Sequence, residues 1–206
     1  MPSPLLGVWE LVSDTGNGLR IFVEGHNATI LIRQADRRRG FISSYSVQGN
    51  RAEANILVDT ATTAPSTGVF EFQRDGDTLT LHALTPGAVA PAGHIDVWRK
   101  MSDAVMTSPY AGVWQLISET DQSMNVRTDT YWATVAMRGD FRRGIGGTYT
   151  VEGNHVSHAI LFDTATDAPP QIDLEFHLEG EILIAKRLSG TLATPAGHVD
   201  RWRKIG

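Results

Sequence analysis

The sequence contains no cysteine, which excludes disulfide bonds, thiolate metal sites and a cysteine nucleophile. It also lacks an excess of positive charge, because 18 lysine and arginine residues stand against 23 aspartate and glutamate residues, giving a formal net charge of -5. Proteins that bind nucleic acid need basic groups to displace counterions from phosphate. The basic runs at residues 37–39 and 142–143 are too short to supply them. We therefore expect no nucleic-acid partner.

Targeting segments and loop motifs of common enzymes are missing as well. The first residues do not combine a charged segment with an apolar run, and no later stretch is apolar over the length of a membrane span. We therefore expect a cytoplasmic protein that does not enter a membrane. The sequence has no glycine-rich phosphate loop, serine nucleophile elbow or dinucleotide-binding motif. Histidines and carboxylates share a strand face at most in pairs, so we expect no metal and no cofactor.

An internal duplication dominates what the sequence does contain. Residues 91–100 and 195–204 are almost identical, and both read Pro-Ala-Gly-His, an aliphatic residue, Asp, a variable residue, and Trp-Arg-Lys. Residues 6–13 and 111–118 also match closely. A repeat at a fixed long period indicates a repeated structural unit.

The two copies align over their whole length. The offset between them changes from 105 to 104 residues at a single one-residue gap near Gln34 and Ala35, where a loop tolerates a change in length. The sequence therefore predicts two domains, residues 1–101 and 110–206, joined by a polar linker at residues 102–109.

The local pattern within each copy is that of β-strands. Apolar and polar residues alternate over short segments, and turn residues follow about every ten positions, which is typical of antiparallel strands. Each copy holds about eight such segments, the number at which a sheet closes around a small interior. We predict an all-β protein made of two tandem antiparallel up-and-down β-barrels. We also expect a monomer with internal pseudo-twofold symmetry, and a homodimer remains open.

Three motifs carry a resemblance to a known family. Each copy opens with Gly-Val-Trp-Glu/Gln-Leu-Val/Ile-Ser, continues with Gly-x-x-x-x-Tyr-x-Val-x-Gly-Asn and ends with Trp-Arg-Lys. These motifs resemble the bacterial lipocalin-like domains of the calycin superfamily, whose barrels are of the lipocalin or streptavidin kind. The resemblance implies that a first-strand Trp packs against a last-strand Arg, here Trp9 with Arg99 and Trp114 with Arg203. It also implies binding of small hydrophobic molecules, and some barrel relatives are cyclases or isomerases.

The repeated His-x-Asp-x-Trp row is the first candidate site. Alternate residues of a strand share a face, so the three side chains of each row point the same way. If the row faces the barrel interior, the carboxylate orients the imidazole for acid-base chemistry or ligand binding. Alternatively, the row is a polar cluster at the barrel rim. The residues are His94, Asp96 and Trp98 in the first copy and His198, Asp200 and Trp202 in the second.

A second candidate lies where the copies differ. His158 replaces Ala54 in a row that is otherwise apolar and ends at Phe162. Burial among apolar groups lowers the pKa of a histidine, which suits it to proton transfer, with Tyr149 as a neighbouring group. Alternatively, His158 is a hydrogen-bonded core residue. Phe162, at the end of this row, and Phe176, in another apolar row, are candidate ligand contacts.

Two aromatic residues of the second copy have no counterpart in the first. Tyr131 and Trp132 replace His26 and Asn27. They form either a binding wall at a barrel mouth or the packing surface between the barrels.

Three functions remain open from the sequence. The first is binding of a small hydrophobic organic molecule in a barrel cavity. The second is a cofactor-independent cyclase, isomerase or lyase of natural-product metabolism that uses a His/Tyr acid-base pair. The third is an interaction protein whose barrels are filled by their own side chains.

Overall fold

The structure is a computed structural model that describes residues 3–14, 16–33, 37–86, 90–165, 171–190 and 195–206. The one-residue gap that aligns the two copies, near Gln34 and Ala35, lies outside the described residues. The described residues form strands and turns, and none of them belongs to a helix that is long and apolar enough to span a membrane.

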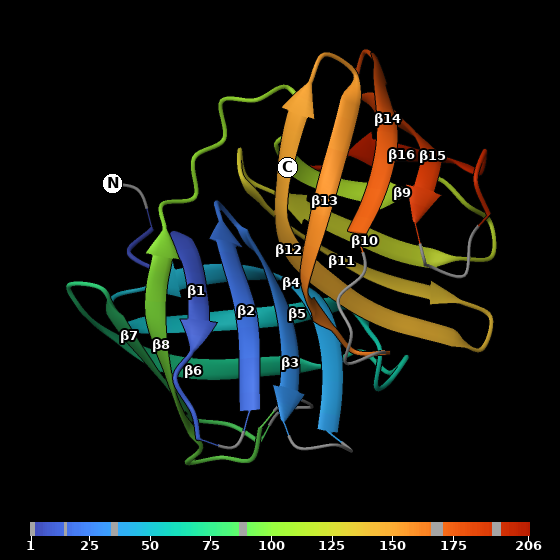
Figure 1. The fold of residues 1–206 in the computed structure, drawn as a ribbon. Coiled ribbons are helices and arrows are strands. Elements are labelled where there is room, and N and C mark those ends of the chain that lie inside the picture. The colour runs from blue at the N-terminus through green and yellow to red at the C-terminus, as the bar shows by residue number, and fades with distance from the viewer. Residues whose placement is uncertain (1–2, 15, 34–36, 87–89, 166–170, 191–194) are drawn as a thin grey trace.

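The first copy folds into a closed barrel of eight antiparallel strands (Figure 1). Each strand pairs with the next one along the chain, and β1 pairs with β8 to close the sheet. The strands are β1 (Gly7–Leu11), β2 (Gly16–Val23), β3 (His26–Arg33), β4 (Arg37–Gln48), β5 (Arg51–Asp59), β6 (Thr67–Asp75), β7 (Thr78–Ala83) and β8 (Ile95–Ser102).

The second copy forms an equivalent closed barrel, in which β16 pairs with β9. The predicted architecture, two tandem all-antiparallel barrels of eight strands, is therefore confirmed. The strands are β9 (Gly112–Leu116), β10 (Gln122–Arg127), β11 (Tyr131–Arg138), β12 (Phe141–Glu152), β13 (His155–Asp163), β14 (Gln171–Glu179), β15 (Ile182–Gly190) and β16 (Val199–Lys204).

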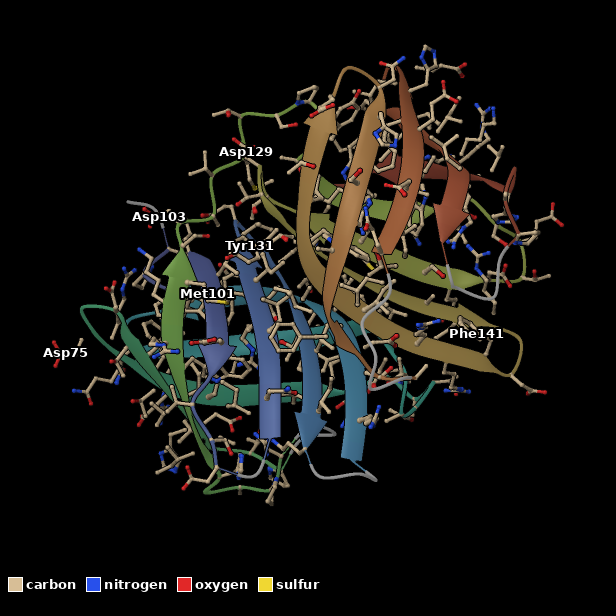
Figure 2. The ribbon with its side chains drawn as sticks, viewed as in Figure 1. Asp75, Met101, Asp103, Asp129, Tyr131 and Phe141 are labelled. Carbon is tan, nitrogen blue, oxygen red and sulfur yellow. The ribbon has the colours of Figure 1, made fainter. Side chains whose placement is uncertain are left out.

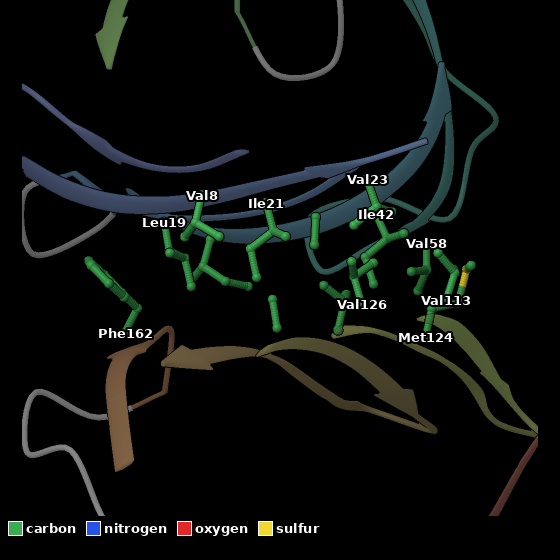
Figure 3. Packing of buried hydrophobic residues seen from close by; sticks show 14 of the residues in the cluster. Val8, Leu19, Ile21, Val23, Ile42, Val58, Val113, Met124, Val126 and Phe162 are labelled. Carbon is green, nitrogen blue, oxygen red and sulfur yellow. The ribbon is translucent and has the colours of Figure 1, made fainter. Parts of the chain in front are cut away.

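The two barrels pack against each other through a shared hydrophobic cluster. Figure 3 shows apolar side chains of the first barrel meeting those of the second between the two sheets. On β2 the outward residues are Leu19, Ile21 and Val23, and they belong to this cluster. The apolar face of β2 is thus directed at the other barrel and not at its own interior. The cluster also contains Val8, Ala28, Ile30, Ile42 and Val58 from the first barrel, and Val113, Met124, Val126, Ala133, Val135, Met137 and Phe162 from the second.

Two glycines at equivalent positions bring β4 and β12 into backbone contact. A Cβ atom built on Gly40 would lie 2.7 Å from the Cα of Gly144, and the reverse distance is also 2.7 Å. Real Cβ contacts to backbone are longer than 3.0 Å. The junction between the barrels therefore requires residues without side chains at both positions.

The tryptophans of the first strands bond to the segment that precedes each of these strands. Trp9 and Trp114 are fully or almost fully buried, and their indole Nε1–H groups donate to the carbonyl oxygens of Leu5 and Tyr110, each at 3.0 Å. Trp98 lies in the same core as Trp9. The segment before each first strand is therefore tied to the core of its barrel.

The expected contacts of Trp9 with Arg99 and of Trp114 with Arg203 are wrong. Arg99 pairs in register with Glu10, whose side chain points away from that of Trp9. The guanidinium of Arg99 is 70% exposed and forms an ion pair with Glu10 on the outer surface. Arg203 is likewise exposed.

Other cations cover the two indoles in their place. The guanidinium carbon of Arg74 lies 5.4 Å from the ring centre of Trp9. In the second barrel, Lys204 Nζ lies 5.5 Å from the ring centre of Trp114. Both distances are within the range of cation–π attraction.

The segment between the barrels is tied to the second one. Asp129, in the turn between β10 and β11, accepts hydrogen bonds from the backbone N–H groups of Thr107 and Ser108, each at 2.8 Å. Figure 2 shows Asp129 beside this connecting segment. The carboxylate therefore fixes the path of the chain between the two sheets.

Candidate functional site

Each barrel contains an interior cavity, and the two differ in size. The cavity of the first barrel has a volume of about 100 Å³, and that of the second has about 310 Å³. The larger one runs from buried Trp132 to Phe141, a residue that is 38% exposed at the end of the β11–β12 hairpin (Figure 2). Its other lining residues are Arg127, Thr134, Ala136, Arg138, Arg143, Ile145, His158, Ile172, Leu174, Ala185, Arg187, His198, Asp200 and Trp202.

Smaller side chains at equivalent positions explain the larger cavity. Ala136 on β11 stands where the first copy has Leu31. Ala185 on β15 stands where the first copy has Leu81. Both leucines are buried in the core of the first barrel, whereas both alanines line the cavity of the second. Two further replacements reduce the side-chain volume in the same way: Ile145 for Phe41 and Leu174 for Phe70.

Four arginines line the larger cavity, and two of them have carboxylate partners. Arg138 donates to Asp200 at 2.8 Å, and Arg143 donates through Nε to Asp163 at 2.9 Å. Among the lining residues that the structure describes, Arg127 and Arg187 have no ion pair with a carboxylate. The cavity therefore carries more positive than negative charge.

Arg127 lies at the inner end of the cavity among aromatic rings. Its guanidinium carbon lies 4.7 Å from the ring centre of Phe176, 5.4 Å from that of Tyr149 and 5.8 Å from that of Trp132. Burial lowers the pKa of Arg127 to about 10. The group thus remains a cation at neutral pH, held by ring faces and not by a counter-charge.

His158 is a neutral acceptor for this arginine. It is 1% exposed, and its Nε2 lies 2.9 Å from Arg127 Nη1. Because a guanidinium only donates, Nε2 accepts and the ring proton is on Nδ1. Burial, followed by the charge of Arg127, holds the pKa of His158 well below its usual value of 6.5. The lone pair of the ring is therefore already used inside the protein.

Aromatic rings surround the same imidazole. Its ring centre lies 4.6 Å from that of Trp132 in an edge-on arrangement, and 5.6 Å from that of Tyr149 in a stacked one. The hydroxyl of Tyr149 donates to the backbone carbonyl of Thr128. Burial raises the pKa of Tyr149. His158 and Tyr149 are thus adjacent, as the sequence suggested, but the proton of Tyr149 is held by the backbone.

Arg187 differs from the other cavity arginines. It is only 9% exposed, yet its Nε and Nη1 atoms are buried without a hydrogen-bond partner among the described residues. Burial lowers its pKa, whereas the carboxylate of Asp200 acts in the opposite direction. Asp200 is already bonded to Arg138. Arg187 therefore presents unused donors on the wall of the cavity.

The repeated His-x-Asp-x-Trp row faces the barrel interior in both copies. His198, Asp200 and Trp202 line the larger cavity, and His94 and Asp96 line the smaller one. Trp98 is fully buried beside them. The orientation that the sequence left open is therefore settled in favour of the interior.

An arginine that the sequence analysis did not assign to the site joins each row. Arg138 Nη1 lies 3.3 Å from His198 Nε2. His198 Nε2 also lies 3.1 Å from Asp200 Oδ1. In the first barrel, Arg33 makes the same contacts with His94 and Asp96. Strands β3 and β8 are not neighbours in the sheet. Because both barrels have this bridge between strands that do not pair with each other, its shared role is to hold those two strands together across the barrel interior.

Of the remaining predicted ligand contacts, Trp132 and Trp202 line the larger cavity, and Phe176 lies below it against Arg127 and His158. Tyr131 packs against the shared cluster between the barrels. Trp132 is therefore a buried wall residue of the cavity and does not lie at a barrel mouth, whereas Tyr131 belongs to the packing surface between the barrels, the second alternative.

The expected place of Phe162 in the same row as His158 is wrong. The pairing of β12 with β13 shifts by one residue between Gly146 and Gly147, so Phe162 pairs with Gly146 and Ile160 with Gly147. A bulge of this kind reverses the alternation of the side chains beyond it. Phe162 consequently joins the cluster between the barrels.

The first barrel is filled in part by its own arginine. Arg20 is 7% exposed, its guanidinium carbon lies 4.6 Å from the ring centre of Trp98, and its Nε donates to Thr29 at 2.8 Å. Burial lowers the pKa of Arg20 to about 10. At the equivalent position the second barrel has Asn125, so this filling group is absent there.

Metal ligands do not gather in the described part of the chain: no group of three or more His, Asp or Glu residues there could hold an ion. No protein-family model matches the sequence, and no curated protein is similar to it at a significant level. The function must therefore be argued from the cavity itself.

Proposed function

We propose that the protein binds a small, largely apolar organic molecule in the cavity of the second barrel. The observation that carries this proposal is the difference between two otherwise matching barrels, about 310 Å³ against about 100 Å³. In the second copy, four inward positions carry smaller side chains than their counterparts in the first copy, while the strand arrangement is the same: Ala136, Ile145, Leu174 and Ala185. Loss of core volume destabilises a protein unless the space is used.

The size of the cavity bounds the molecule. A water molecule occupies about 30 Å³ of the liquid, so the volume corresponds to about ten waters, or to roughly 10 to 20 non-hydrogen atoms. The cavity has apolar side chains on its wall, as binding sites for small organic molecules usually do: Trp132, Ile145, Ile172 and Trp202. The motifs that resemble lipocalin-like domains favour the same function. We also propose that the chain is a cytoplasmic monomer with two domains, residues 1–101 and 110–206.

An enzyme that uses His158 as its acid-base group fits the cavity less well. The Nε2 lone pair of His158 accepts from Arg127, so it is not free to take up a proton from a ligand, and the Tyr149 hydroxyl donates its proton to the backbone. The His198/Asp200 pair is bonded to Arg138 in an arrangement that the first barrel repeats. An interaction protein with filled barrels is disfavoured by the volume of the second cavity.

The test is binding of the neutral fluorescent probe 1-anilinonaphthalene to the wild-type chain and to filled variants. Ala136→Leu and Ala185→Leu restore the side chains that the first barrel has at these positions. Ala159→Leu is the matched control, because Ala159 is exposed on the outer face of β13. We expect one probe per chain, with binding reduced at least about tenfold in both filled variants and unchanged in the control.

Binding that persists in both filled variants, or two equivalent probes per chain, would overturn the proposal. Native mass spectrometry of the gently purified chain gives a second readout. An added mass that is present in the native protein, and absent after denaturation or in Ala185→Leu, supports a ligand in this cavity.

A further inference from the structure

We propose that the ligand carries an acidic group, and that Arg187 and Arg127 bind it inside the second barrel. The ligand class is thus an organic acid with one carboxylate or sulfonate group and an apolar body. This inference rests on the proposed binding function and specifies the chemistry of the molecule that is bound.

The first argument is the charge of the cavity wall. Four guanidinium groups line it, and the carboxylates that pair with them are Asp163 and Asp200, each bonded to one arginine. Two of the four cations, Arg127 and Arg187, thus form no ion pair with a carboxylate among the described residues. Burial of a charge is unfavourable unless a partner compensates it, and an anionic ligand is the partner that the cavity itself has room for.

The second argument is the state of Arg187. Its Nε and Nη1 atoms are buried and unpartnered among the residues that the structure describes, although the side chain lies on the cavity wall. Each of these unpartnered guanidinium donors can form a charge-assisted hydrogen bond to an oxygen of an anion. A neutral apolar ligand would leave both donors unsatisfied and would cover them from water, which makes its binding weaker.

The third argument is where these arginines occur. Arg187 stands at the position of Ala83, and Arg127 stands at the position of Phe22. The two unpaired cations thus belong to the copy that has the larger cavity. Among the described side chains of the first barrel, the interior arginine without a carboxylate partner is Arg20, and its guanidinium is bonded to Thr29 and stacked on Trp98. Enlarged volume and unused positive charge therefore coincide in the second barrel.

The residues around the two arginines suggest how such a ligand lies. Arg127 lies among aromatic rings at the inner end, and its pairing with His158 leaves Nε without a partner among the described atoms. Arg187 lies on β15 together with Ala185, so its donors border the space that the small side chain opens. The apolar body would fill the space beside Ala136 and Ala185, with its acidic group between the two arginines.

The experiment compares two probes that differ by one charged group: 8-anilinonaphthalene-1-sulfonate and neutral 1-anilinonaphthalene. We expect the wild-type chain to bind the sulfonate roughly 10- to 100-fold more tightly than the neutral probe, as hydrogen bonds to a charged group allow. Arg187→Met should abolish most of this preference while binding of the neutral probe is kept or improved. Arg187→Lys, which retains the charge, should keep part of it.

Arg142→Gln is the matched control, because it removes one positive charge from the exposed side of β12, next to Arg143 in sequence. It should leave the preference unchanged. If the wild-type chain binds both probes equally and Ala136→Leu binds neither, the inference of an acidic ligand is overturned. The proposed binding function would still hold in that case. A preference that survives in Arg187→Met also overturns it. If neither probe responds to Ala136→Leu, the proposed function itself fails.

Discussion

The closest approach between the two barrels gives a sharp test of how they pack. Gly40 and Gly144 face each other, and a Cβ atom on either one would lie 2.7 Å from the Cα of the other. The obstructing atom belongs to the backbone, so it cannot move aside as the end of a flexible side chain would. The side chain of Ile30 is also close, at 3.2 Å from a Cβ on Gly40. Gly40→Ala should therefore force the two sheets apart locally.

The expected magnitude follows from overpacking of a tight core. Insertion of a methyl group into a well-packed interior costs about 1–3 kcal/mol. With a urea m-value of about 2 kcal/mol/M, a loss of about 2 kcal/mol lowers the unfolding midpoint by about 1 M. Gly68→Ala is the control, since a Cβ at Gly68 would meet no atom within 4 Å. That substitution should be neutral or slightly stabilising, because alanine restricts the unfolded chain.

The assay is equilibrium urea unfolding followed by tryptophan fluorescence. Gly144→Ala should behave like Gly40→Ala, and the double variant should lose less than the sum of the two, because one displacement of the sheets relieves both clashes. A Gly40→Ala variant with the wild-type midpoint would refute the close backbone contact of β4 and β12. So would equal effects of Gly40→Ala and Gly68→Ala.

Three further predictions concern other parts of the molecule. The pKa of His158 in the folded state lies well below 6.5, so at acidic pH the unfolded chain binds one proton more than the folded chain. The free energy of unfolding should therefore fall as the pH drops below about 6.5. In His158→Gln, the urea midpoint of unfolding should fall less steeply across pH 5–7. Arg74→Ala should lower the free energy of unfolding by about 0.5–1 kcal/mol, because it removes the contact of Arg74 with Trp9. Arg99→Ala, on the exposed surface, should change the thermal midpoint little. A larger effect of Arg99→Ala would instead favour the expected contact between Trp9 and Arg99. Asp129→Asn should weaken the hydrogen bonds that hold residues 107 and 108. Thermolysin should then cleave the chain faster within residues 102–109. An unchanged cleavage rate would contradict the role assigned to this carboxylate.

The architecture could be predicted because it depends on patterns that a single sequence displays. The repeat of about 104 residues separates two units, and strand alternation with regular turns gives about eight strands in each. Burial of His158 also followed from its apolar neighbours along the strand. These features are local, or are repeated in full, and therefore need no knowledge of which strands meet.

The charged cavity wall could not be found by the same reasoning. An arginine in an alternating strand normally marks the solvent side, and Arg127 alternates with Val126 and Met124. Here those apolar residues face the other barrel, so the interior receives the polar set. A signal was present in β2, where Phe22 lies on the face opposite to that of Leu19, Ile21 and Val23, so neither face has the composition of a surface strand.

The misplaced contacts depended on register, which the sequence does not contain. Phe162 left its expected row because of a one-residue bulge in β13, and Arg99 turned outward because β8 pairs with β1 opposite Glu10. A shift of one residue changes the face of every later side chain. Such shifts are decided by packing between distant strands.

The covalent connection between the barrels has an evolutionary consequence. In a homodimer of identical subunits, every substitution occurs twice, so a mutation that hollows one barrel hollows the other and its destabilising effect is doubled. In this chain, position 136 is alanine while the equivalent position 31 is leucine. Because the two copies are fused, each barrel can change separately, so the more filled barrel can serve as a stable support for a neighbour with a larger interior space.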